Sequence, residues 1–169
     1  MTLTYSNSQT TSRRQELFLL LILSLLMLQG QAAETEAETS FQVGRQYYEK
    51  KAYAAAIEAF STAVRLAPEI STYHHWLGKS YGRLAQNSNL LKAYRLSGRT
   101  REELERAVAL DDKNIEAITD LMEFYRQAPA FLGGGQDKAD KLRWRLEELQ
   151  KQNMSSGVNL TPPGLSNQR

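Results

Sequence analysis

The sequence contains no cysteine and only two histidines, His74 and His75. The absence of cysteine excludes disulfides, thiol catalysis, Cys-based zinc sites and the lipid-carrying cysteine of a bacterial lipoprotein. Neighbouring residues on a helix point about 100° apart, so the two histidines do not face one metal ion together. The sequence also shows no arrangement of serine, histidine and acidic residues that is typical of a known catalytic nucleophile. We therefore expect no catalytic, metal or cofactor site, and a protein that is not an enzyme.

The chain also lacks a large excess of charge of either sign. Its formal net charge is +2 and its pI is about 8.8, whereas nucleic-acid binding usually requires a strongly basic face. Nucleic acid is therefore not an expected partner. The one run of glycines, at residues 133–135, is followed by Asp137 and not by the Lys and Ser or Thr of a phosphate-binding loop. We interpret this run as a flexible connector.

Long apolar stretches are scarce, and the clearest one covers residues 17–28, which are apolar apart from Ser24. It follows Arg13 and Arg14 and precedes small residues at positions 30–33, which is typical of a secretory signal peptide. A membrane span needs about 20 apolar residues. We therefore predict a signal peptide over residues 1–32, cleavage near 32/33, no stable membrane span after cleavage, and a periplasmic or secreted protein. An uncleaved N-terminal anchor is the alternative.

The most informative pattern that is present lies at residues 56–68. Ala56, Phe60 and Ala63 fall at helical spacing and share one face, and Pro68 ends the helix. The two alanines leave room for a neighbouring helix to approach closely. A first helix is predicted over residues 36–50, in which Val43, Gly44 and Tyr47 face this partner.

The first-helix pattern returns after one fixed interval. Leu77, Gly78 and Tyr81 stand 34 residues after Val43, Gly44 and Tyr47. This spacing, with the following Ala, Phe and Pro positions, resembles the tetratricopeptide repeat (TPR) family. The resemblance implies helix pairs stacked into a solenoid that binds proteins through its surface.

The second-helix pattern of this repeat comes later in the sequence than a period of 34 residues would place it. Leu104 and Ala107 follow Phe60 and Ala63 by 44 residues, so ten residues are inserted within 86–100. One interpretation starts the repeat helix at Thr100, with a capping box to Glu103, after a short extra helix over 89–96 that ends at Gly98. The alternative is one long helix over 89–110 that contains Gly98. Ser71 or Thr72 is the predicted N-cap of the preceding helix.

A third copy is predicted from its apolar positions Ile118, Leu121 and Tyr125. A loop over 128–135 leads to a closing helix over 137–152, which has Arg143 where the repeat usually has an aromatic residue, so we expect a cap with one side in water. Residues 153–169 form a polar, proline-containing tail that we expect to be disordered.

The expected fold is therefore all-α: a short right-handed α-solenoid of about three TPR-like helix pairs. Its domain covers residues 33–152, with repeats at about 37–70, 71–114 and 115–152. The inserted second repeat and the segment at 129–139 also resemble a group of small exported bacterial TPR proteins of undefined function.

In TPR proteins the first helix of each pair lines the concave face. Carrying the family's groove positions onto this sequence predicts a protein-binding groove at Phe41, Arg45, Tyr48, His75, Lys79, Arg83, Glu123 and Arg126. Its basic and aromatic content favours an extended, acidic peptide or protein segment, or a C-terminal carboxylate, although the family's known carboxylate-clamp pattern is not reproduced. The predicted function is a non-catalytic interaction module or scaffold outside the cytoplasm. A membrane-tethered assembly factor and an accessory subunit of an envelope enzyme are the alternatives.

A second basic group lies within the insertion. If this segment is helical, Lys92, Arg95 and Arg99 share one face, which suits an acidic partner or anionic lipid. A solvated surface is the other interpretation of these charges.

Overall fold

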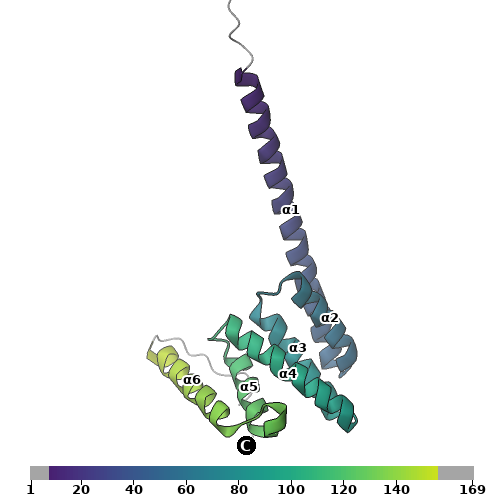
Figure 1. Cartoon of the computed structure of the whole chain (residues 1–169), viewed down its shortest axis with the longest axis vertical. Helices are drawn as coiled ribbons and strands as arrows, with labels where there is room; N and C mark the ends of the chain where they lie inside the picture. Colours follow the sequence, from purple (N-terminus) through teal and green to yellow (C-terminus); the bar gives the residue numbers. More distant parts are fainter. Residues whose placement is uncertain (1–7, 156–169) are drawn as a thin grey trace, which may run out of the picture.

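The computed structural model describes residues 8–155, with the side chains of residues 18–22 and 31–155. This part of the chain is helical and contains no strand. Three helix pairs, α1 with α2, α3 with α4 and α5 with α6, stack through α2 against α3 and α4 against α5 (Figure 1). The helices are α1 (Ser8–Glu49), α2 (Tyr53–Leu66), α3 (Ser71–Gln86), α4 (Leu90–Leu110), α5 (Ile115–Gln127), the 3₁₀ turn η1 (Ala130–Leu132) and α6 (Gln136–Ser155). The all-α solenoid predicted from the sequence is confirmed.

The first pair is held together by small and aromatic residues, as the sequence predicts. Ala56, Phe60 and Ala63 of α2 are fully buried. A Cβ atom at Gly44 of α1 would lie 2.6 Å from the Phe60 ring, so only glycine allows the two helices to approach this closely. Val43 and Tyr47 were expected to face α2, but both side chains are exposed, so the prediction is wrong for these two residues.

Helix α1 begins much earlier than the expected residue 36, and its N-terminal half extends away from the other helices (Figure 1). Residues 31–40 contain neither proline nor glycine, so nothing in this stretch ends the helix. Residues 1–7 of the predicted signal peptide, and the side chains of residues 8–17 and 23–30, lie outside the described part. Within the described part, no helix combines the length and apolar character that a membrane crossing requires.

The second pair repeats the glycine contact. A Cβ atom at Gly78 of α3 would lie 3.0 Å from Cγ of Leu104 on α4. The predicted caps at Ser71 and Thr72 are wrong, because Ile70 is the N-cap residue and forms no side-chain capping bond. The hydroxyl of Ser71 donates instead to the carbonyl oxygen of Ala107, at 2.8 Å, and so links the two helices of the pair.

The insertion forms part of one long helix. Asn89 caps α4 by accepting a hydrogen bond from the backbone N–H of Lys92 at 3.0 Å, and the helix runs through Gly98 without a break. Thr100 is buried in mid-helix and donates to the carbonyl of Leu96, so the capping box and the separate short helix are wrong. The better N-cap at Asn89 and the burial of Thr100 favour the continuous helix.

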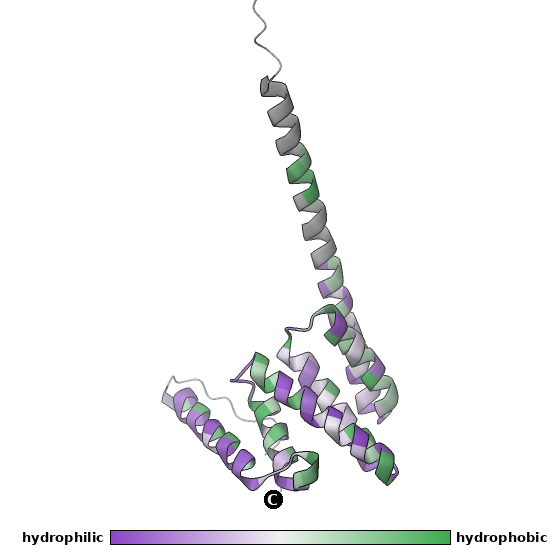
Figure 2. Cartoon of the chain, viewed as in Figure 1, coloured by the Kyte–Doolittle hydropathy of each residue, from purple (hydrophilic) through white to green (hydrophobic). Residues whose placement is uncertain are grey.

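The third pair closes the domain. Ile118, Leu121 and Tyr125 of α5 are buried as predicted. The loop after α5 contains η1 and turns at Gly133, whose φ of 88° suits glycine. Helix α6 buries Ala139 and Leu149, while hydrophilic residues predominate along its length (Figure 2), as expected of a cap. It ends at Ser155, three residues beyond its predicted end; residues 156–169 of the predicted tail lie outside the described part.

Candidate functional site

Two of the eight predicted groove residues lie in the interior and cannot contact a partner. Phe41 is 6% exposed, and its ring centre lies 5.6 Å from that of Phe60 and 4.9 Å from that of Tyr73. His75 is 1% exposed, and its Nε2 lies 2.7 Å from a carboxylate oxygen of Asp120 on α5. The prediction is corrected for both residues, because Phe41 is covered by residues of α2 and α3, and His75 is covered where α3 meets α5.

Four other predicted residues are brought together by an aromatic residue that the sequence prediction missed. The ring centre of Trp76 on α3 lies 5.1 Å from the guanidinium carbon of Arg45 and 5.0 Å from the ammonium nitrogen of Lys79. Tyr48 meets the indole edge-on, with the ring centres 5.2 Å apart. Arg83 donates from Nε to the hydroxyl of Tyr48 at 3.3 Å. We call Arg45, Tyr48, Trp76, Lys79 and Arg83 the indole cluster.

Asp120 sets the charge balance at the α5 side of this cluster. Its carboxylate lies 3.8 Å from the nitrogen of Lys79 and accepts a hydrogen bond from His75. Burial raises the pKa of Asp120, but the hydrogen bond from His75 and the charges of Lys79 and Arg83 outweigh it and hold the pKa below its usual value. Asp120 therefore remains ionised and partly neutralises Lys79.

The two arginines of the indole cluster are incompletely paired. Arg83 has no carboxylate partner among the described residues, and its hydrogen bond to Tyr48 raises its pKa further. Arg45 lies 4.0 Å from Glu49, while its buried Nε has no hydrogen-bond partner among the described residues. Such guanidinium groups bind carboxylates in a bidentate manner when one is supplied.

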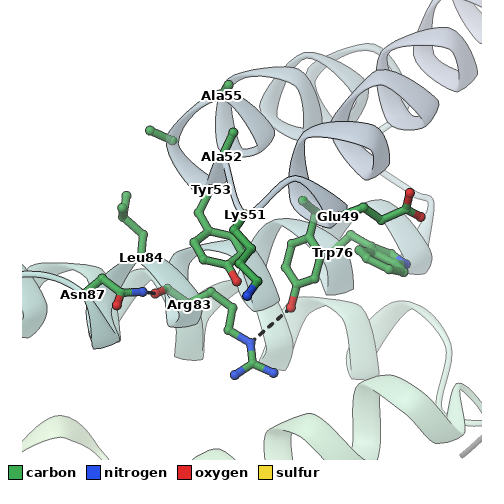
Figure 3. A pocket seen from close by; sticks show the side chains of 11 residues that line it. Glu49, Lys51, Ala52, Tyr53, Ala55, Trp76, Arg83, Leu84 and Asn87 are labelled. Atoms are coloured by element: carbon green, nitrogen blue, oxygen red, sulfur yellow. Dashed lines mark hydrogen bonds between the residues drawn. The ribbon is translucent and has the colours of Figure 1, made fainter.

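An open hollow of about 1130 Å³ adjoins the cluster, between the turn that joins α1 to α2 and the second half of α3 (Figure 3). Three aromatic side chains, Tyr48, Tyr53 and Trp76, line it together with Arg83, whose side chain lies near Tyr53 in Figure 3. Its lining residues are Tyr48, Glu49, Lys51, Ala52, Tyr53, Ala54, Ala55, Trp76, Arg83, Leu84 and Asn87. The hollow is large enough for a few side chains of a bound peptide.

The last two predicted groove residues do not join the cluster. Glu123 and Arg126 of α5 form an ion pair with each other at 2.6 Å, which lowers the pKa of Glu123. Their opposite charges therefore pair with each other on the surface of a single helix. The described residues also include no group of three or more His, Asp or Glu side chains placed to share a metal ion.

Trp76 stands one position after the predicted groove residue His75, and Asp120 is not a groove position of the family pattern, so the pattern missed both. A signal for Trp76 was present, since Lys79 follows it by three residues and Arg83 by seven, which places all three on one side of a helix. No comparable signal pointed to Asp120, because its partners belong to another helix.

The stacked helix pairs define the class of protein as a helical-repeat protein, a class whose members form extended concave surfaces. Residues 44–84 match the family model described as TPR repeat. The protein therefore carries a tetratricopeptide repeat, and its helices have the fold of a TPR domain.

A solved TPR domain shows the same fold. The Arabidopsis OM64 TPR domain superposes with a TM-score of 0.56 and 16% identity, covering 75% of this chain and 92% of that domain. The Sgt2 TPR domain from Aspergillus fumigatus gives a TM-score of 0.45 and 19% identity, covering 79% of this chain and 89% of that domain. Comparison with curated proteins gave no sequence match.

Proposed function

We propose that this protein is a non-catalytic interaction module that binds an extended, acidic segment of a protein partner across the indole cluster. The observation that carries the proposal is the position of Trp76, which has the cations of Arg45 and Lys79 at about 5 Å from its ring. TPR domains in general mediate protein–protein interactions, and their scaffolds bind through the surface formed by stacked helices.

The physical basis is the combination of a large aromatic area with cations that are incompletely paired. Trp76 and Tyr48 offer contact area at low entropic cost. Arg83, which lacks a carboxylate partner among the described residues, would hold an acidic side chain or terminal carboxylate of the ligand at the hollow. Asp120 would repel an acidic ligand at the α5 side, so we place the ligand toward α1 and the hollow.

The compartment belongs to the same proposal. We infer export to the periplasm or the medium, because residues 17–28 with Arg13 and Arg14 have the layout of a signal peptide. N-terminal sequencing of the protein recovered from the exported fraction tests this inference, with a new N-terminus near residue 33 as the expected result. A chain that retains residues 1–32 and stays with the membrane would favour the tethered alternative.

The binding test uses a direct optical signal. The chain has two tryptophans, so Trp144→Phe leaves Trp76 as the single tryptophan reporter. We expect its fluorescence to change on titration with peptides rich in Asp and Glu, and the affinity to fall as salt is raised. Peptides of the same length with amide side chains are the matched ligand control.

In this background Arg45, Lys79 and Arg83 are changed together to alanine, which should abolish binding. The matched control changes Arg65, Lys113 and Lys141, which are exposed elsewhere on the domain, and should leave binding intact at the same net charge. Far-ultraviolet circular dichroism checks that both variants keep their helix content. If the first variant retains all binding, or captures every partner that the unchanged protein captures, the site lies elsewhere, such as residues 92–101.

A further inference from the structure

Four large apolar side chains project into solvent at the far end of the second repeat. Leu90, Leu91 and Tyr94 at the start of α4 are 88%, 70% and 52% exposed, and Phe131 of η1 is 75% exposed. The rings of Tyr94 and Phe131 stack nearly parallel, with their centres 6.4 Å apart, so the two segments form one surface. We call these four residues the tip patch; hydrophobic residues are visible at that end of the α3–α4 pair in Figure 2.

Basic side chains border the tip patch. Lys92, Arg95 and Arg99 are exposed and follow one another at spacings that place them on one side of α4, next to Leu91. Arg99 pairs with Glu102 at 3.2 Å, whereas Lys92 and Arg95 form no ion pair with any described residue. The border of the patch is therefore net positive.

Side-chain and backbone hydrogen bonds satisfy part of the backbone at this end. The side chain of Asn89 accepts from the N–H of Lys92, and its carbonyl accepts from the N–H of Ala93. Ser88 and Asn87 donate from their side chains to the carbonyls of Leu84 and Arg83 at the end of α3. These bonds lower the cost of moving this end out of bulk water, because an unsatisfied backbone group is expensive to bury.

We propose that the tip patch is a membrane-contact site that inserts its four apolar side chains into the interfacial layer of a bilayer containing anionic lipid. Exposed leucine and aromatic residues bordered by Lys and Arg are the combination that favours such a surface, with apolar burial and electrostatic attraction acting together. The patch protrudes as separate, highly exposed side chains. A lipid layer adapts to that shape, whereas a protein partner would need a complementary cavity.

The absence of cysteine makes a site-specific test straightforward. Leu91→Cys and Phe131→Cys in the full chain are each labelled with an environment-sensitive dye and mixed with vesicles. Vesicles of phosphatidylcholine with phosphatidylglycerol should shift both dyes to the emission of an apolar environment, and pure phosphatidylcholine should do so much less. Trp144→Cys, at a position on α6 that is 69% exposed, is the matched control and should show no shift.

Because the N-terminal apolar segment is common to all these variants, only a difference between label positions supports the proposal. Changing Lys92, Arg95 and Arg99 to glutamate in the Leu91→Cys chain should weaken the response at least about tenfold, since each basic residue near an anionic surface strengthens binding roughly fivefold. The same reversal at Arg65, Lys113 and Lys141 should have little effect.

Equal shifts at all three label positions, or no shift at positions 91 and 131, would overturn the proposal. A shift that appears only with proteins from an envelope extract, and not with lipid, would overturn it as well and assign the patch to a protein partner.

Discussion

At the scale of single residues, Gly44 of α1 and Gly78 of α3 show how little space separates the paired helices. A Cβ atom at Gly78 would lie 3.0 Å from Leu104 and 3.1 Å from Glu103, so Gly78→Leu should force α3 and α4 apart. We expect the free energy of unfolding to fall by about 1–3 kcal/mol, measured by urea denaturation. Gly98→Ala is the control: a Cβ atom there would have no neighbour within 4 Å, so this change should stabilise α4 by about 0.5–1 kcal/mol. Unchanged stability of the Gly78 variant would contradict the close contact.

The second prediction at this scale concerns pH. His74 is buried, with Nδ1 2.7 Å from a carboxylate oxygen of Glu103 and Nε2 3.0 Å from the carbonyl of Pro68. Only the protonated ring can donate to both acceptors. Burial lowers the pKa of His74, but the hydrogen bonds to Glu103 and Pro68 raise it by more, so the pKa in the folded protein lies above the ordinary value of 6.5.

A raised pKa means that the His74–Glu103 contact stabilises the fold fully below the unfolded-state pKa and loses this contribution as pH rises through the folded-state value. Glu103→Gln should therefore lower the free energy of unfolding more at about pH 5.5 than at about pH 9, as measured by urea denaturation. A difference between variant and unchanged protein that is the same at both pH values would show that the charge on His74 contributes nothing.

At the scale of elements, two asparagines cap successive helices in different surroundings. Asn89 caps α4 at an exposed end. Asn114 caps α5 by accepting from the N–H of Ala117, and it also donates to the hydroxyl of Ser71, which donates to Ala107. Asn114 therefore connects α3, α4 and α5 as well as starting a helix.

We accordingly expect Asn114→Ala to destabilise the protein more than Asn89→Ala, whose cost should be near the ordinary value of about 1 kcal/mol for a lost cap. Hydrogen exchange should show faster exchange confined to the first turn of α4 in the Asn89 variant. In the Asn114 variant the rate of amide hydrogen exchange should rise on both sides of the α4–α5 junction. Equal, local effects in both variants would mean that the link through Ser71 carries no stability.

At the scale of the whole molecule, α6 completes the core of the last repeat. Leu104, Leu121, Tyr125 and Ala139 form one buried cluster to which α4, α5 and α6 all contribute. A chain that ends at residue 127 should therefore lose the packing of α5 as well as the removed helix, because an uncovered terminal repeat exposes apolar surface. Circular dichroism should show a loss of helix larger than α6 alone accounts for. A chain that ends at residue 155 is the control and should keep the full signal.

The sequence by itself determined the parts of this protein that depend on local chemistry and on repetition. The interval of 34 residues between Gly44 and Gly78 predicted stacked helix pairs, and the structure confirms them. Helical spacing correctly selected Ala56, Phe60 and Leu121 as core residues, because residues three and four apart must share a face. The family pattern also located Arg45 and Arg83, whose side chains project from first helices toward Trp76 and Tyr48.

Only the tertiary structure decided what covers each face. Spacing places Phe41 and Arg45 on neighbouring parts of one helix surface, yet Phe41 is buried by Phe60 and Tyr73 while Arg45 stays accessible. The pairing of His75 with Asp120 across α3 and α5 joins residues 45 positions apart, and no local pattern encodes that contact. The physical reason is that periodicity defines which side chains share a direction, whereas their burial and charge pairing depend on how closely the other helices approach.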